Sequence, residues 1–261
     1  FYPSITGGVT LSELIPGMTD TKNDWFSYLK LRGNWAMVGK DAPAYLFDRR
    51  FGQYPTLPDG GYSYNPSFST GFNLRPEMSS SWEVGVDVRF FAGRTRLDVA
   101  YYSIQTNNQI VTVRVPYTSG YVLQTRNEGS VKNHGVEISL EQDIIKNSDW
   151  TWTAAFNFGL NRGVVVDLPD DVDFIQGTQY GDIFPVAYKG ASTTGLCGSD
   201  YLRTEDGKVI VNENGYPKIN PNKNEYIGNR EAKFQAGLSS SMNIYGVQFS
   251  FLFDGRLGGD V

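Results

Sequence analysis

The sequence has 261 residues, a formal net charge of -5 and no block of lysines and arginines, so nucleic acid is not an expected partner. Aromatic residues make up 14% of the chain and there are 29 glycines, which favours an all-β protein with many turns. The single cysteine, Cys197, and the single histidine, His134, exclude an internal disulfide and a metal site built from several Cys or His side chains.

The predicted elements are antiparallel strands, each with one apolar and one polar row. The clearest is 81–91, SWEVGVDVRFF, in which the row from Trp82 through Val84, Val86 and Val88 to Phe90 alternates with Ser81, Glu83, Gly85, Asp87 and Arg89. In chain order, strands are predicted at residues 4–11, 29–36, 81–91, 96–101, 110–115, 135–141, 150–161, 233–245 and 246–253. No segment shows a competing helical period, so we expect about eight or nine antiparallel strands.

The connections between these strands alternate in length. Short turns are expected at residues 92–94, 145–149 and around 245, and long excursions at 39–79, 103–132 and 163–231. Aromatic residues gather at the short-turn end: Trp25, Tyr28, Phe90, Phe91, Trp150, Trp152 and Tyr245. Short periplasmic turns, long extracellular loops and an aromatic girdle at the membrane interface are typical of a transmembrane β-barrel. The sequence therefore predicts apolar rows that face membrane lipid and polar rows that face a lumen.

Two other classes of protein remain open at this point. A soluble carbohydrate-binding β-sandwich would have the same alternation, but a second sheet would cover its apolar rows. An outer-membrane barrel enzyme would need a serine or a carboxylate pair converging with His134, and the spacing of the sequence shows neither.

Four stretches carry a more specific pattern: YLKLRGNWAMVGK, LRPEMSSSWEVGVDVRFFAGRTRLDVAYYSIQTNNQI, NEGSVKNHGVEISLE and the tail YIGNREAKFQAGLSSSMNIYGVQFSFLFDGRLGGDV. They resemble the barrel of SusC/RagA-type TonB-dependent transporters of the Bacteroidetes outer membrane. The resemblance covers nearly the whole chain, in the order found in the family.

The resemblance implies a plugged barrel of about 22 strands in the cell outer membrane. It implies import of oligosaccharides (glycans) or peptides, with a SusD-like surface lipoprotein as partner and with energy supplied by the TonB complex. Residues 1–261 are similar to a middle-to-late part of the barrel domain, so the plug domain and the final strands are expected to be absent. A nutrient importer of this kind is not an enzyme, and we predict no catalytic residue, cofactor or metal.

Substrate contacts are expected in the long loops, because strand residues must satisfy the barrel wall. The loop tyrosines could stack on ligands, and the alternative is that they pack the loops themselves: Tyr45, Tyr54, Tyr62, Tyr64, Tyr180, Tyr188 and Tyr201. Of these, Tyr62, Tyr64, Tyr180 and Tyr201, together with Arg203, are the predicted substrate-binding residues. The wall residues Arg32, Glu83 and Asp87 are the second choice.

Other reactive side chains are better explained by structural roles. Cys197 is expected to be a loop thiol and His134 a strand-entry residue. The carboxylates Asp167, Asp170, Asp171 and Asp173 could bind Ca²⁺, but a solvated acidic loop explains them as well. The pairs Glu83/Asp87 and Glu137/Glu141 could suggest glycoside hydrolysis, and cross-strand pairing with Arg89, Arg96 or Lys233 is the structural alternative.

Overall fold

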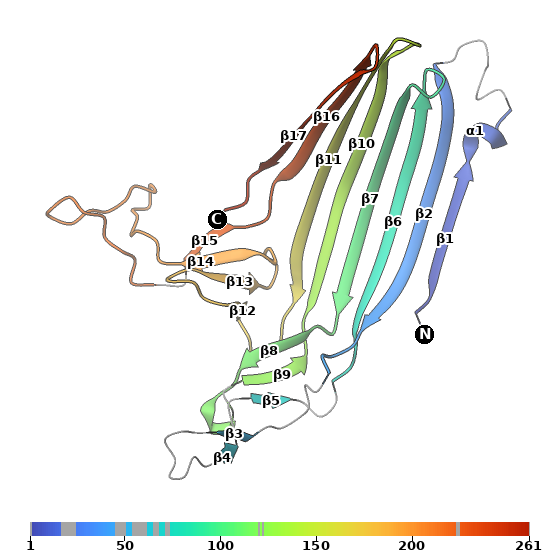
Figure 1. The fold of residues 1–261 in the computed structure, drawn as a ribbon. Coiled ribbons are helices and arrows are strands. Elements are labelled where there is room, and N and C mark those ends of the chain that lie inside the picture. Colours follow the sequence, from blue (N-terminus) through green and yellow to red (C-terminus); the bar gives the residue numbers. More distant parts are fainter. Residues whose placement is uncertain are drawn as a thin grey trace.

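The computed structural model of the chain describes residues 2–16, 25–44, 51–53, 62–64, 68–70, 74–119, 121, 123–222 and 225–260. Its main element is one antiparallel sheet of eight strands in the order β1-β2-β6-β7-β10-β11-β16-β17 (Figure 1). These strands are β1 (Ser4–Thr10), β2 (Phe26–Lys40), β6 (Glu77–Phe90), β7 (Thr95–Asn107), β10 (Ser130–Lys146), β11 (Trp150–Asp167), β16 (Phe234–Ile244) and β17 (Val247–Leu257).

Each long strand pairs with the next long strand along the chain, as in an up-and-down barrel. The strands after β1 run from 11 residues in β16 and β17 to 18 in β11, long enough to cross a bilayer at the usual tilt. β1 and β17 are the two edges, and the sheet does not close on itself. The predicted all-β class and the antiparallel order of the long strands are confirmed. The large sheet has eight strands, and shorter strands outside it bring the described total above the eight or nine that were predicted.

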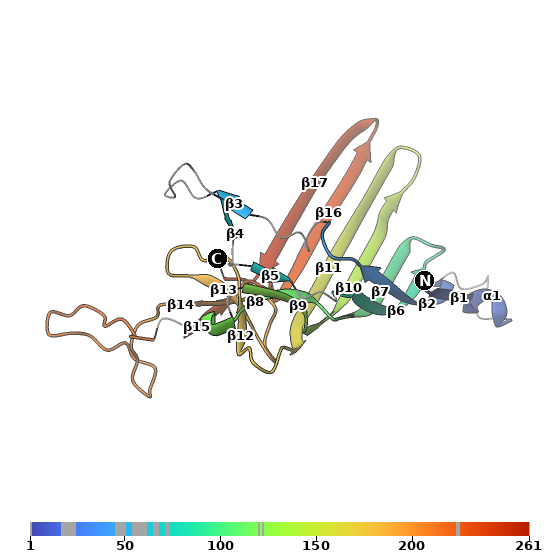
Figure 2. The same cartoon turned by 90° about the horizontal axis from the view of Figure 1, so that it is seen from below.

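One side of the sheet, here called the apolar face, has no second layer of described residues against it. Figure 1 and Figure 2 show the eight strands as a single curved layer. Val84 is 52% exposed and Phe249 58%. Many other large side chains of this face are also exposed, among them Leu31, Trp35, Trp82, Tyr101, Leu140, Phe156, Leu238 and Phe253. An apolar surface of this extent is not stable in water, so the β-sandwich alternative is wrong and lipid is the expected neighbour.

The opposite side, here called the polar face, carries a ladder of ion pairs. Arg32 on β2 reaches over β6 to Asp98 on β7, with Nη2 2.9 Å from Oδ1, and its Nε lies 3.7 Å from Glu83. This crossing depends on Gly85, since a Cβ there would lie 2.6 Å from Cζ of Arg32. The ladder stabilises the pairing of three adjacent strands without an apolar core.

The carboxylate pairs that could suggest hydrolysis belong mostly to this ladder. Glu141 pairs with Arg96 on the neighbouring strand, as the structural alternative predicted, whereas Asp87 pairs with Arg89 of its own strand at 3.4 Å. Arg96 also lies 3.3 Å from Asp143 on β10. Because these carboxylates are held by arginines, they are positioned as wall residues and not as acid and base.

The short turns are joined side by side at one end of the sheet (Figure 1). The N–H of Phe91 donates to the carbonyl of Trp25 (3.1 Å), and the N–H of Tyr245 donates to the carbonyl of Asp149 (2.9 Å). The rings of Trp25 and Phe90 are stacked with centroids 6.1 Å apart. Tyr245 is 82% exposed in its turn. This arrangement confirms the predicted clustering of aromatic residues at the short-turn end.

The long excursions form smaller elements at the other end of the large sheet (Figure 1). The strands are β3 (Phe51–Gln53), β4 (Tyr62–Tyr64), β5 (Phe68–Thr70), β8 (Ile110–Arg114), β9 (Leu123–Asn127), β12 (Phe174–Gln176), β13 (Phe184–Tyr188), β14 (Gly195–Gly198) and β15 (Glu225–Asn229). They make the sheets β3-β4, β5-β9-β8 and β12-β13-β14-β15. A 3-10 turn spans Tyr117–Ser119, and α1 (Leu11–Leu14) joins β1 to β2. No helix in the described ranges has the length and apolar character needed to cross a membrane.

Candidate functional site

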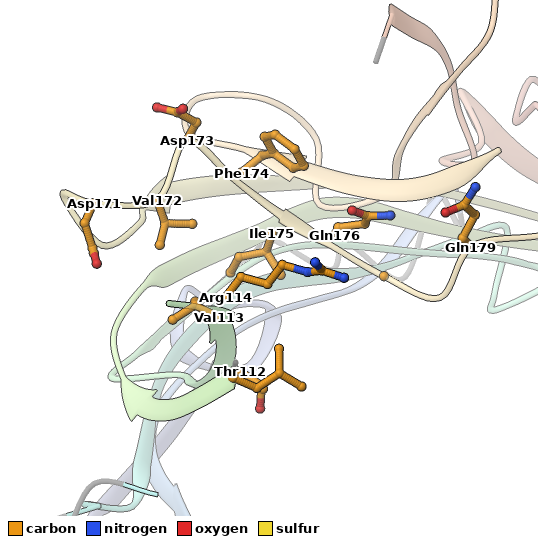
Figure 3. Close-up of a pocket in the computed structure, with 12 residues that line it drawn as sticks. Thr112, Val113, Arg114, Asp171, Val172, Asp173, Phe174, Ile175, Gln176 and Gln179 are labelled. Carbon is orange, nitrogen blue, oxygen red and sulfur yellow. The ribbon is translucent and has the colours of Figure 1, made fainter. Parts of the chain in front are cut away.

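A cavity of about 500 Å³ lies at the long-loop end, between the β8–β9 hairpin and β12 (Figure 3). Thr112, Val113 and Arg114 of β8 line one side, and Phe174, Ile175 and Gln176 of β12 line the other. β8 and β12 belong to different excursions, so only the folded chain brings these residues together. The volume is within the range of small-ligand sites, about 300–1,000 Å³.

The two ends of the cavity differ in chemistry: one carries Arg114 and two amide side chains, and the other is acidic. Figure 3 shows the side chains of Arg114, Gln176 and Gln179 extending to one end, with Asp171 and Asp173 at the other. Arg114 has neither an ion pair nor a side-chain hydrogen bond within the described ranges. Its guanidinium is therefore available to a ligand.

The acidic end of the cavity is partly neutralised by Arg126 on β9. Arg126 pairs with Asp171, and this hydrogen-bonded pair holds the pKa of Asp171 below its usual range. The Nε of Arg126 lies 2.7 Å from Glu128. These contacts attach the 168–173 segment to the β8–β9 hairpin and so fix one wall of the cavity.

The predicted loop residues lie on separate elements. Tyr180 follows β12 and is 75% exposed. Tyr201 and Arg203 lie on an arm at 199–222 that projects away from the sheets (Figure 1). Arg203 is held by Asp200 at 3.5 Å and by the carbonyl of Gly207 at 3.3 Å. Tyr62 and Tyr64 lie on β4, paired with β3, where the structure describes the backbone.

The arm contains two tight turns. Gly207 has φ +78°, and the N–H of Thr204 donates to the carbonyl of Lys208 (2.9 Å), which closes a turn at Asp206-Gly207. Gly215, with φ +81°, turns the chain again. Tyr45 and Tyr54 lie outside the described residues.

The expectation of a loop thiol at Cys197 is wrong. Cys197 lies on β14 and is 0% exposed, in a small core with Phe184 and Val186. Tyr188, also predicted as a loop aromatic, packs against this core, with its Oη 3.5 Å from Sγ of Cys197. That hydrogen bond, together with burial, raises the pKa of Tyr188 to about 12. Sequence reasoning missed this core because its alternation covers only a few residues in each short strand.

Because Cys197 is buried in the small sheet, the reactivity of its thiol reports whether this sheet is formed. We expect maleimide labelling in intact membranes to be at least tenfold slower at Cys197 than at a cysteine placed at Glu213 on the exposed arm. The reason is that the thiol must be uncovered by local opening before it reacts. Mass spectrometry of the labelled protein measures both rates, and equal rates would show that the small sheet does not form.

Two members of the acidic cluster have separate cation partners. Asp167 accepts a hydrogen bond from Lys189 at 2.6 Å, whereas Asp171 pairs with Arg126. Among the described residues no three His, Cys, Asp or Glu side chains are arranged to hold a metal ion. Asp167 and Asp171 are therefore positioned by cations of this chain.

The strand position of His134 does not make it a catalytic base. The register places it on β10 opposite Ser103 of β7, on the apolar face. No hydrogen bond joins the two side chains within the described ranges, and Ser103 is only 3% exposed. Nδ1 of His134 is buried without a hydrogen-bond partner, so the group that would orient a base is missing.

The excursion after β11 returns to the large sheet through a tight clamp. Arg162 donates from Nη1 to the carbonyl of Ala232 (2.8 Å) and from Nη2 to the carbonyl of Lys233 (2.8 Å). The N–H of Gly163 donates to Glu231 at 2.7 Å. These bonds hold the two ends of the excursion at the sheet, so changes within the loop need not disturb the strands.

Two hollows on the polar face lead from the mid-strand region towards this clamp. Their volumes are about 290 and 410 Å³, and they share Glu137, Gly159 and Gln235. The first extends to Glu231 beside the clamp, and the second reaches Asp98 in the ion-pair ladder. Together they make a continuous polar surface along the wall, as expected for the inside of a barrel.

An open sheet of long up-and-down strands, an uncovered apolar face, a polar face and an aromatic short-turn end together define part of an outer-membrane β-barrel. Residues 21–237 match the family described as TonB dependent receptor-like, beta-barrel. The chain belongs to this family, and it is part of an outer-membrane protein.

The chain is similar to several known members of this class. It is 28% identical over 249 residues to TonB-dependent receptor SusC of Bacteroides thetaiotaomicron, covering 86% of this chain and 24% of SusC. It is 28% identical over 211 residues to TonB-dependent receptor P3 of Formosa agariphila, covering 72% of this chain and 21% of that protein. The chain thus spans less than a third of these receptors, none of which is named as an enzyme.

The fold has solved counterparts. The RagAB peptide transporter superposes with a TM-score of 0.76 at 22% identity, covering 98% of this chain and 29% of that one. The RagAB peptide importer in its open-open state superposes with a TM-score of 0.77 at 20% identity. At this identity the likeness establishes the fold.

Proposed function

We propose that this chain forms part of the wall and outer loops of a TonB-dependent importer that takes up oligosaccharides or peptides together with a SusD-like surface lipoprotein. The observation that carries the proposal is the polar face with its hollows, together with a ligand-sized cavity among the long loops. A structural barrel segment alone would not require this cavity.

In this proposal the barrel wall and the loops have different roles. The ion-pair ladder and the apolar face stabilise the strands in the membrane. The excursions at 39–79 and 163–231 receive the substrate and contact the lipoprotein, and TonB supplies the energy for passage. Arg114, Gln176 and Gln179, which line one cavity, are a further group that would bind a ligand, beside the predicted loop tyrosines and Arg203.

The projecting arm offers a clean test of this division. Gly198 and Glu225 are register partners on β14 and β15, so residues 199–224 can be replaced by an Asn-Gly turn. In the complete transporter, we expect this deletion to leave membrane insertion at the wild-type level. Uptake of the cognate nutrient, or co-purification of the lipoprotein, should fall at least fivefold because an outer binding surface is lost.

Protease protection of the barrel measures insertion, and labelled-nutrient uptake in cells with and without TonB measures transport. A matched control replaces Asn214-Gly215 at the arm's tip by Asp-Gly, which preserves the turn. If uptake does not depend on TonB, the import function is wrong. If uptake depends on TonB and neither it nor lipoprotein association changes in the deletion, the arm is not the contact surface.

A further inference from the structure

We propose that the cavity between β8 and β12 binds an extended peptide, which adds as a strand to an exposed sheet edge and places a carboxylate at Arg114. This inference rests on the proposed import function and names the substrate class that this site would take. β12 is the edge of its four-stranded sheet and β8 is the edge of its three-stranded sheet. The cavity therefore lies between two strand edges.

The edge of β12 presents unpaired backbone groups to the cavity. The N–H of Gly177 donates to the carbonyl of Pro185 (2.8 Å), which places Gly177 on the side paired with β13. Backbone groups alternate in direction along an antiparallel strand, so the N–H and C=O groups of Phe174 and Gln176 point to the free side. Within the described ranges no strand pairs with that side.

The edge of β8 has the same arrangement. The N–H of Glu128 donates to the carbonyl of Gln109 (2.9 Å), so Gln109 faces β9 and alternate residues from Ile110 onwards face outward. Ile110 shows this directly, because its N–H donates to the Glu77 side chain (2.9 Å) and not to β9. Thr112 and Arg114 follow at the same spacing, and both line the cavity.

An extended peptide satisfies these groups better than a sugar does. A peptide carries donors and acceptors at the strand repeat, whereas a sugar ring does not, and main-chain pairing with pockets for side chains is a known mode of peptide recognition. Phe174 is the one aromatic residue among the described residues that line the cavity, and its ring already packs against Tyr188, with centroids 5.3 Å apart. The apolar side chains of Val113 and Ile175 remain as contacts for a peptide side chain.

Arg114 gives the site a preference for a carboxylate. Its guanidinium lies at the end of the cavity with the amides of Gln176 and Gln179, away from Asp171 and Asp173 (Figure 3). A planar guanidinium binds a carboxylate through two parallel hydrogen bonds. The carboxylate could come from a peptide C-terminus or from an acidic sugar, and the probes below separate these sources.

The test uses the complete transporter in outer-membrane vesicles. Fluorescein-labelled peptides of alternating valine and threonine are titrated as the free acid, as the C-terminal amide and with N-methyl groups on alternate residues. Labelled oligogalacturonate is the acidic-sugar probe. The two variants are Arg114→Gln, which removes the cation, and Gln176→Pro, which removes an outward N–H. Gln176→Ala is the control for the lost glutamine side chain. Lys132→Gln is the control for the loss of a positive charge.

We expect saturable binding of the free-acid peptide, weakened about tenfold or more by N-methylation or by Gln176→Pro. The loss in Gln176→Ala should be smaller, because that variant lacks the amide side chain but keeps the outward N–H. Arg114→Gln should weaken the free acid about tenfold and leave the amide unchanged, since a hydrogen bond to a charged group is lost. Lys132→Gln should have no effect. If Gln176→Pro fails to insert, the N-methylated peptides still test strand addition on the wild-type protein.

Binding of oligogalacturonate but not of peptide, with TonB-dependent uptake of the sugar, would overturn the peptide inference and leave the import function standing. Peptide binding that is indifferent to both variants and to N-methylation would show that the cavity is not the site. Absence of TonB-dependent uptake for both probes and for the cognate nutrient would overturn the import function itself.

Discussion

Replacing Val86 by arginine is expected to destabilise the membrane-inserted barrel by about 2–4 kcal/mol, because the charge would lie near the middle of the apolar face. Val86 is in mid-strand, with Leu31 of β2 and Val99 of β7 as its register partners. Reversible unfolding of the complete transporter in lipid vesicles measures the change in the free energy of unfolding. The level of protease-protected barrel in cells measures the effect on assembly.

The matched control is Ser139→Arg. Ser139 lies on the polar face of β10, opposite Asp98, and is exposed. An arginine there meets water and a carboxylate, so we expect a change of less than about 1 kcal/mol. Gly85 would be an unsuitable control, because any side chain there displaces Arg32 from the ion-pair ladder. Equal losses in the two variants would mean that the apolar face does not contact lipid.

Replacing Gly135 by valine is expected to cost about 3 kcal/mol and to reduce barrel assembly severely, through overpacking and a broken strand contact. The ring of Tyr102 lies over Gly135, and a Cβ at this glycine would be 2.6 Å from Oη of Tyr102. It would also press on the carbonyl oxygen of Leu160, which cannot move without disturbing β11. Tyr102 donates to Asn161 at 3.1 Å, so its displacement would also remove a link across three strands.

Gly159→Val is the control, since a Cβ at Gly159 meets no atom within 4 Å and lies on the same polar face. We expect this variant to insert at the wild-type level and to be changed by less than about 0.5 kcal/mol. Heat-modifiability of the barrel on gels and protease protection report the comparison. If Gly135→Val forms a normal barrel, the ring of Tyr102 does not lie over Gly135.

The close contacts at Gly85 and Gly135 could not be predicted from the local sequence. Alternation identifies both glycines as polar-face residues, but nothing in their neighbourhood indicates that Arg32 or Tyr102 crosses above them. Such crossings depend on the register of three strands, and register is a property of the whole sheet. The same holds for Arg114 and Gln176, which come from separate excursions and meet only because their loops fold at one end.

The strand positions, the two faces, the alternation of short and long connections and the family could all be predicted from the sequence. These features are local or periodic, because a strand repeats every two residues and a bilayer selects for an apolar row of sufficient length. The distances between the predicted loop tyrosines could not be inferred for the opposite reason, since irregular loops have no period. The folded chain was needed to show that Cys197 is buried, that Asp167 and Asp171 have separate cation partners and that β8 and β12 face each other across a cavity. Each of these depends on contacts between segments distant in the chain, whose energies outweigh local preference and leave no local pattern.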